Sequence, residues 1–194
     1  MRYFFSLILF FLLLTSPCSA AHPIEMEELL DRLAALNLNQ NGYTLGRVLT
    51  DVQMKTALQY PLKVENPEIY KFQDGDLYIV AEKITDRVII LYKQYDPASR
   101  KKIQEVVGAL FLDFGDPTIF VHDKIIYWAF GPKGKISEQE YNKIKEEKGK
   151  LDILATLKLT SSLEIMKKIG DMDIGNVYYI LSSPPVLGII NQAR

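Results

Sequence analysis

Three consecutive segments with strand-like hydrophobic patterning, joined by short turns, restrict this chain to a fold built around an antiparallel sheet. The segments are residues 69–73, 76–82 and 87–93, and Asp74-Gly75 separates the first two. An Asp-Gly pair favours a type I′ hairpin because both of its positions tolerate positive φ. Parallel strands need a crossover of a dozen or more residues, which these turns are too short to provide. The segments therefore predict an antiparallel meander.

Helices are expected around this meander. Residues 24–37 carry apolar side chains at helical spacing, with glutamates in the first turn, where they favour the helix dipole. Thr50-x-x-Gln53 is a capping-box pattern in front of a short helix that ends near Tyr60. Asp96-Pro97 matches an N-cap followed by proline at the first helical position, which predicts a helix over residues 97–113. Gly115 is placed to end that helix.

The rest of the chain repeats the order of helix and then strands. A hairpin is expected over residues 118–130 with its turn at Asp123-Lys124, and Ser137 begins a charged helix that runs to about Lys148. Further strands are predicted at 151–160 and 177–181, with a short helix at 163–169 between them. The fold class is α+β, an antiparallel meandering sheet with helices packed on one face, and the pattern allows two helix-plus-sheet repeats.

The N-terminus has the pattern of a secretory signal peptide. Arg2 precedes an apolar run from Tyr3 to Leu14, and a proline and small residues follow. The run is shorter than the roughly 20 residues of a membrane span, so we expect cleavage after residue 20 and no transmembrane anchor afterwards. A lipid anchor at Cys18 is the lesser alternative. The mature chain, residues 21–194, is expected to be one domain in the bacterial periplasm or outside the cell, with 183–194 a surface tail.

Composition narrows the function classes. The chain has 23 basic and 24 acidic residues, one cysteine and two histidines. Such a balance offers no electrostatic footprint for nucleic acid. Too few sulfur and imidazole groups are present for a structural zinc site or a disulfide framework. We therefore expect no cofactor and no metal.

One stretch resembles known exported domains. The spacing Ile103-x-x-Val106-Val107-x-x-Leu110 is followed by Gly115-Asp116-Pro117 and then by Tyr127-Trp128. This helix, Gly-x-Pro stop and tryptophan-bearing strand resemble the outer-membrane assembly lipoprotein BamE (SmpA) and the domains similar to β-lactamase-inhibitor proteins. The resemblance covers about 30 residues and implies an exported helix-plus-sheet fold. It carries over no functional residue.

Catalytic signatures are sparse. His122, with Asp113, Asp116 and Asp123 near it in sequence, could act as a general base oriented by a carboxylate. The alternative, which we favour, is that these aspartates bond local backbone at turns and helix ends. We expect the protein not to be an enzyme, and a hydrolase using His122 ranks last.

Aromatic side chains on strands are the remaining feature. Tyr70, Phe72, Tyr127 and Trp128 are the candidate partner-binding residues. Neighbouring strand residues point to opposite faces, so an uncovered face would expose some of them. The opposing expectation is that both faces are buried. We expect a non-enzymatic binding domain, a protein-interaction, assembly or inhibitor module that binds another envelope protein. The alternative is a periplasmic carrier that holds a small apolar ligand, a lipid or peptide, between helices and sheet.

Overall fold

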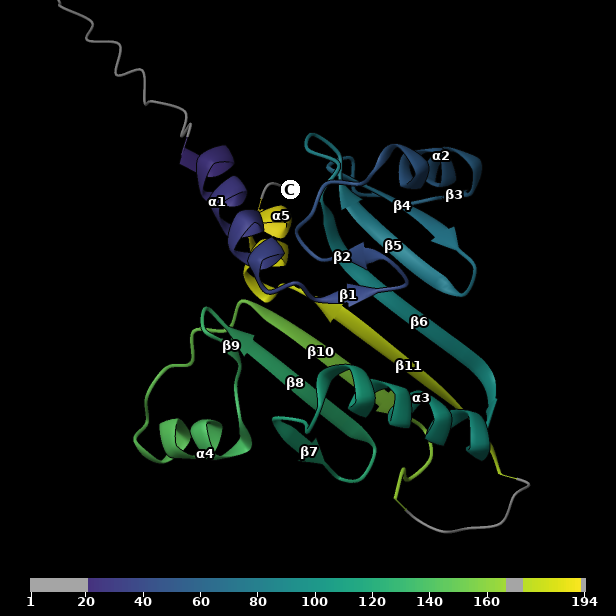
Figure 1. The fold of residues 1–194 in the computed structure, drawn as a ribbon, viewed down its shortest axis with the longest axis vertical. Coiled ribbons are helices and arrows are strands. Elements are labelled where there is room, and N and C mark those ends of the chain that lie inside the picture. Colours follow the sequence, from purple (N-terminus) through teal and green to yellow (C-terminus); the bar gives the residue numbers. More distant parts are fainter. Residues whose placement is uncertain (1–20, 167–172, 193–194) are drawn as a thin grey trace, which may run out of the picture.

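The computed structural model describes residues 21–166 and 173–192, in which the helix Arg100–Phe114 and a two-stranded ribbon over residues 39–44 lie on one side of a large sheet (Figure 1). The predicted signal peptide, including Cys18, lies outside the described residues, as does the end of the helix expected at 163–169. The helices are α1 (Ala21–Ala35), α2 (Asp51–Gln59), α3 (Arg100–Phe114), α4 (Glu138–Glu146) and α5 (Pro184–Gln192). The strands are β1 (Asn39–Gln40), β2 (Tyr43–Thr44), β3 (Pro61–Leu62), β4 (Ile69–Asp74), β5 (Leu77–Glu82), β6 (Val88–Ser99), β7 (Ile119–Val121), β8 (Ile125–Gly131), β9 (Gly134–Lys135), β10 (Ala155–Ser161) and β11 (Ile174–Ser182).

The main sheet joins two helix-and-meander halves. Its order is β3-β4-β5-β6-β11-β10-β8-β7, with β9 paired to β8, and β1 with β2 forms a separate ribbon. Every one of these pairings is antiparallel. Helix α2 precedes the strands of the first half and α3 those of the second, and β6 pairs with β11 where the halves meet. The predicted α+β class with an antiparallel meander is confirmed.

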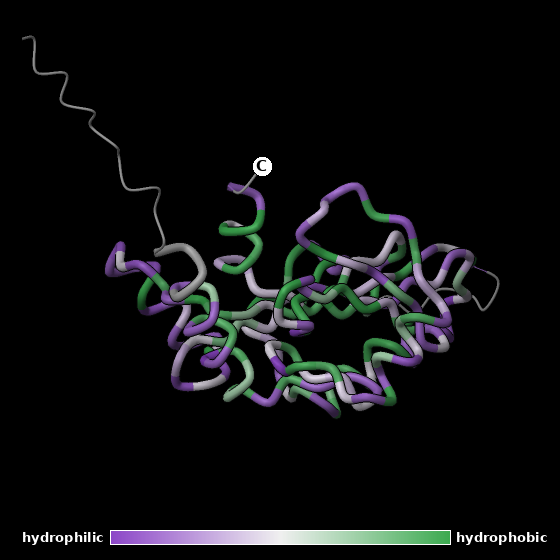
Figure 2. Tube along the Cα trace, turned by 90° about the horizontal axis from the view of Figure 1, so that it is seen from above, coloured by the Kyte–Doolittle hydropathy of each residue, from purple (hydrophilic) through white to green (hydrophobic). Residues whose placement is uncertain are grey.

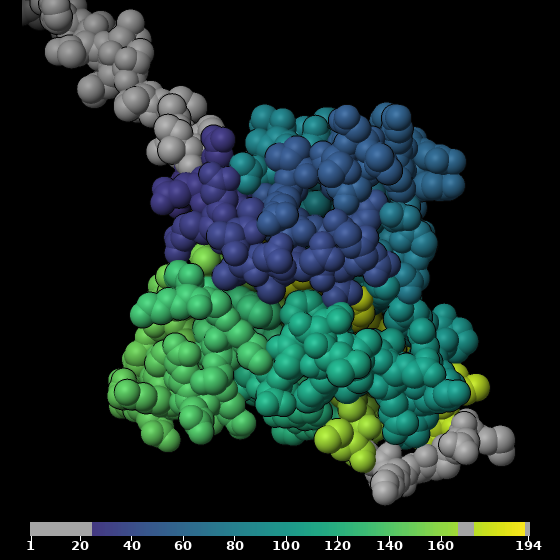
Figure 3. Space-filling view, in the orientation of Figure 1, coloured from purple at the N-terminus to yellow at the C-terminus, as the bar shows by residue number. Residues whose placement is uncertain are grey.

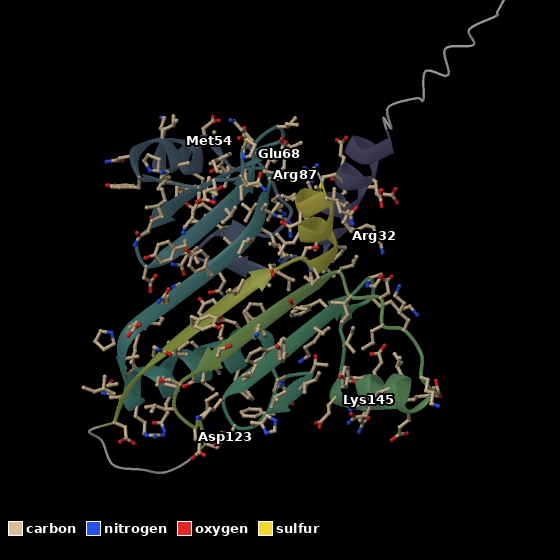
Figure 4. All side chains as sticks on the ribbon, turned by 180° about the vertical axis from the view of Figure 1, so that it is seen from behind. Arg32, Met54, Glu68, Arg87, Asp123 and Lys145 are labelled. Atoms are coloured by element: carbon tan, nitrogen blue, oxygen red, sulfur yellow. The ribbon has the colours of Figure 1, made fainter. Side chains whose placement is uncertain are left out.

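Only one face of the central sheet is covered. Helix α3 contacts β6 and β11, and the β1–β2 ribbon lies on the same side (Figure 1). Seen from behind, β6, β11, β10 and β8 cross the molecule with no helix in front of them (Figure 4). Burial alternates along β10 accordingly, since Leu157 and Leu159 are fully buried and Lys158 between them is not. The central strands therefore have one core face and one open face.

Local capping signals place several helix ends correctly. Thr50 accepts from the backbone N–H of Gln53, and the Gln53 side chain accepts from the Thr50 N–H, which completes the predicted capping box. Ser137 accepts from the Glu140 N–H at the start of α4. Gly115 ends α3 with a φ of 68°. At the two N-termini, a side chain accepts from a backbone N–H three residues away, and at Gly115 the glycine adopts a positive φ, so each helix end is set by local groups.

The Asp96-Pro97 prediction is wrong. Both residues belong to β6, and the N-cap of α3 is Ser99, whose hydroxyl accepts from the Lys102 N–H. Strand β6 continues because β11 pairs with it as far as Ser99. Cross-strand pairing thus overrides a local cap signal.

The first hairpin turn is also shifted by one residue. Asp74 pairs with Leu77, so Gly75 and Asp76 are the central residues, and of these two only Gly75 has positive φ. Glycine at the first central position is the preference of a type II′ turn rather than of the predicted type I′.

The C-terminal segment is a packed helix instead of the expected surface tail. Val186 and Ile190 of α5 are buried, and α5 contacts α1. Figure 2 shows α5 rising toward the C-terminus with hydrophobic positions in green. The run of apolar residues after Pro184-Pro185 has a helical period, and α1 provides the surface that buries it.

Candidate binding surfaces

Phe72 and Trp128 are core residues, which corrects their prediction as partner-binding residues. Both side chains are completely buried. The Trp128 ring packs edge-on against Phe111 of α3, and its Nε1 donates to the Gly115 carbonyl at 2.7 Å. An indole with its one donor satisfied inside the core offers nothing to a partner.

Tyr70 and Tyr127 keep some exposure, but only Tyr127 faces outward. The Tyr70 hydroxyl donates to Asp86 Oδ1 at 2.8 Å and its ring stacks on Phe72, so it holds the β5–β6 turn to the sheet. Tyr127 lies on the open face of β8, where Lys158 Nζ is 5.6 Å from its ring centroid. The structure thus retains one of the four predicted residues as surface.

A row of half-buried side chains crosses the open face. The registers place Tyr78, Tyr92, Ile180, Lys158 and Tyr127 side by side on five neighbouring strands. The Tyr78 and Tyr92 rings stack at 4.6 Å with 9° between their planes. Such cross-strand aromatic pairs rigidify the sheet and leave ring edges toward solvent.

Lysines complete this surface. Lys71 Nζ lies 5.3 Å from the Tyr78 centroid and 5.2 Å from the Tyr92 centroid, within the range of a cation–π interaction. Lys71 and Lys158 give this face positive charge. Residues paired across β4, β5, β6, β11 and β10 in register with Tyr92, and those in register with Lys71, include no acidic residue. We call Lys71, Tyr78, Tyr92, Ile180, Lys158 and Tyr127 the tyrosine–lysine face. Most of this face was not predicted from the sequence. Alternation along a strand separates two sets of side chains, but only the packing of the helices decides which set is buried and which is exposed.

The covered side has a groove between the two halves. Figure 3 shows the blue N-terminal segments meeting the teal and green segments, with yellow β11 visible in the seam. Two adjoining hollows of about 630 and 340 Å³ lie there, and both are lined by Gln40, Asn41 and Asp113.

Two hydrogen bonds, one buried and one partly buried, span this groove. The Tyr179 hydroxyl of β11 donates to Gln40 Oε1 at 2.8 Å, and Gln40 Nε2 donates to Asp113 Oδ2 of α3 at 3.4 Å. Burial raises the pKa of Tyr179, and the nearby acidic groups add to the effect, so its hydroxyl stays a donor. No local sequence pattern relates residues 40, 113 and 179, which only the fold brings together.

A second network stands beside the first. Asp76 accepts from Lys93 Nζ at 2.8 Å and from the Tyr95 hydroxyl at 2.7 Å. Burial works to raise the pKa of Asp76, but the bonds from Lys93 and Tyr95 outweigh it, and the pKa lies below its ordinary value. Burial and the bond to Asp76 raise the pKa of Tyr95. Lys102 Nζ lies 4.4 Å from the Tyr95 ring centroid.

His122 sits in the β7–β8 turn, away from both surfaces. His122 and Asp123 have φ values of 50° and 53°, and the Lys124 N–H donates to the Val121 carbonyl across them. Because Val121 pairs with Ile125, the loop has three residues, 122–124, and the predicted turn at Asp123-Lys124 lies within it. The Asp123 carboxylate accepts from the Met166 N–H, which is backbone 43 residues away in sequence and not the local backbone that the favoured interpretation expects. His122 is exposed and makes no side-chain hydrogen bond within the described residues.

Among residues 21–166 and 173–192, no group of three or more His, Cys, Asp and Glu side chains is arranged to hold a metal ion. No helix in that same part of the chain has the length and apolarity to cross a membrane. Comparison of the chain with protein-family models, with curated proteins and with solved structures found no match.

Proposed function

We propose that this protein is a non-enzymatic, exported binding domain that recognises another protein of the bacterial envelope through its tyrosine–lysine face. The signal-peptide pattern and the similarity to exported helix-plus-sheet domains support the compartment. We also propose that binding needs no cofactor.

One observation carries the choice of surface: an uncovered sheet face with three tyrosines and two lysines in fixed positions. Tyrosines provide large contact area with few rotamers to immobilise, and stacking holds Tyr78 and Tyr92 in place before a partner arrives. A rigid aromatic surface therefore loses little entropy on association.

Charge defines the partner further. Lys71 and Lys158 make the face positive, and their ammonium groups stay partly solvated beside tyrosine rings. An acidic protein surface complements such a face and is drawn to it at low ionic strength. Binding should weaken as salt is raised.

The carrier of a small apolar ligand is less well supported. The hollows on the covered side are lined largely by amides and charged side chains. A pocket for a lipid would instead present mostly apolar walls.

Site-specific photocrosslinking in the envelope tests the surface. A photoreactive amino acid is placed at Tyr92 or Tyr127, and at Leu112 as the control, because Leu112 is exposed on α3 on the covered side. We expect a discrete crosslinked protein from the two face positions only. Its purified form should bind the wild type and lose affinity for Tyr92→Ala and Lys158→Ala.

Two results would contradict the proposal. One is equal crosslinking from Leu112 and from the face positions. The other is a purified partner that binds Tyr92→Ala and Lys158→Ala as tightly as the wild type while both variants keep the wild-type unfolding temperature.

A further inference from the structure

The larger hollow on the covered side is lined by amide side chains, which the tyrosine–lysine face lacks. Its volume is about 630 Å³, and it lies between the segment 36–42 and the end of α3. Four amide-bearing residues of the segment 36–42 line one side, Asn37, Asn39, Gln40 and Asn41. Asp113, Phe114, Phe130 and Lys135 line the opposite side.

We propose that this hollow is a binding site for a neutral saccharide. Each hydroxyl of a saccharide both donates and accepts a hydrogen bond. An amide side chain offers two donors and an acceptor, and a carboxylate offers only acceptors, so amides with one carboxylate match a ring of hydroxyls. The site would be separate from the tyrosine–lysine face and on the other side of the sheet.

Several of these polar groups have hydrogen-bonding capacity to spare. The Asn37 side chain and Asn41 Nδ2 make no hydrogen bond within residues 21–166 and 173–192, and Asp113 Oδ1 accepts none there. Asn39 is already committed, since it donates to Thr44 and accepts from the Gly42 N–H. The available groups thus lie on both sides of the hollow.

The buried part of the site is held in position from below. Gln40 is only 7% exposed, and its amide is oriented by Tyr179 and Asp113. Its amide group carries a second N–H, beyond the one that Asp113 accepts. A polar group fixed by neighbours before a ligand arrives loses little freedom on binding.

Apolar surface lies beside the amides. Phe114 packs edge-on against the buried Phe130 with centroids 6.2 Å apart, and Leu36 approaches from the end of α1. Saccharide rings have C–H faces as well as hydroxyl edges, and the C–H faces gain from contact with aromatic and aliphatic carbon.

Charge favours a neutral ligand over an ionic one. The hollow contains one carboxylate, Asp113, and one ammonium, Lys135. Lys135 Nζ donates to the carbonyl of Phe114, the last residue of α3, and to that of Asp116 just after it, where a cation complements the helix dipole. The Lys135 ammonium group is therefore directed at the end of α3. The residues that line the hollow include no group of several charges of the same sign that would favour an ionic ligand.

Titration of the full mature chain with the neutral trisaccharides cellotriose, maltotriose and N,N′,N″-triacetylchitotriose, followed by amide NMR, tests the site. We expect saturable shifts with at least one trisaccharide, confined to residues 36–42, 113–114, 130 and 135. The double variant Asn37→Gly/Asp113→Asn should weaken that binding about tenfold or more, because it removes the Asn37 amide and the Asp113 carboxylate. Glycine suits the φ of 53° at position 37, and an amide at position 113 can still accept from Gln40 Nε2. Both residues are exposed, so the variant should keep the wild-type spectrum elsewhere.

Two controls separate this site from the proposed protein interface. Leu112→Ala, beside Asp113 but exposed to solvent, should bind the saccharide like the wild type. Tyr92→Ala, on the open face, should do the same. The proposal is overturned if no trisaccharide gives saturable shifts, if the shifts map to the open face, or if the double variant binds as tightly as the wild type.

Discussion

The Tyr179 hydroxyl donates to Gln40 Oε1 across 139 residues of sequence, at 2.8 Å and out of contact with solvent. The bond ties the β1–β2 ribbon to β11, where the two halves of the sheet meet. It connects the N-terminal segment to the floor of the groove.

Tyr179→Phe should destabilise the protein by about 1–3 kcal/mol, because it leaves the buried Gln40 acceptor without its partner. Tyr178→Phe is the matched control, since Tyr178 lies next to it on the open face and its hydroxyl makes no hydrogen bond within the described residues. Urea unfolding of both variants measures the difference. Equal midpoints for the two variants would show that the bond adds nothing to stability.

Trp128→Ala should cost about 3–5 kcal/mol, the range for removing a large buried aromatic side chain. The neighbouring Tyr127→Ala should cost much less, since Tyr127 packs on the open face. Thermal unfolding of the two variants compares them directly. An unchanged melting temperature for Trp128→Ala would mean that the indole is not part of the core.

Two glycines with similar backbone angles should respond differently to alanine. Gly42 and Gly46 have φ values of 85° and 81°, so both variants are strained by about 1–2 kcal/mol. A Cβ at Gly42 meets nothing within 4 Å, whereas one at Gly46 would lie 2.5 Å from the Leu30 carbonyl oxygen. Gly46→Ala should therefore lose about 1–3 kcal/mol more, because α1 must move away. Similar unfolding free energies for both variants would contradict the close packing of α1.

Stability should fall at alkaline pH through three tyrosine–aspartate hydrogen bonds. Tyr43, Tyr70 and Tyr95 donate to Asp74, Asp86 and Asp76. Burial and these bonds raise the pKa of each tyrosine above its ordinary value of 10. Above that value the unfolded chain releases protons that the folded chain keeps, so the stabilisation from these three tyrosines is fully present below about pH 10 and declines as pH rises further.

Urea midpoints between about pH 8 and pH 11 measure this decline. The Tyr70→Phe variant should show a shallower pH dependence than the wild type, since one of the three groups no longer titrates. Parallel curves for the two proteins would remove Tyr70 from the explanation.

Local sequence signals predicted much of the secondary structure. The capping groups at Thr50, Ser137 and Gly115 lie where expected, because each acts on backbone within a few residues. The antiparallel meander over residues 69–93 was also predictable, since turn length limits how its strands can pair. Asp96-Pro97 misled because a partner strand far along the chain decides the end of β6.

The candidate site residues were less predictable. Alternation showed that Tyr127 and Trp128 point to opposite faces, but not which face the helices cover. Docking of α3 against β6 and β11 makes Trp128 core and leaves Tyr127, Tyr92 and Lys158 open. The groove depends on Gln40, Asp113 and Tyr179, whose distances in sequence give no local sign of contact.

The sequence by itself therefore determined the α+β class, several helix ends and the antiparallel meander over residues 69–93, because those depend on backbone groups and side chains a few residues apart. Only the tertiary structure decided which side chains form its surfaces. Burial of one sheet face, the β6–β11 pairing and the docking of α5 on α1 are contacts between distant segments, and their free energy appears only when the whole core assembles.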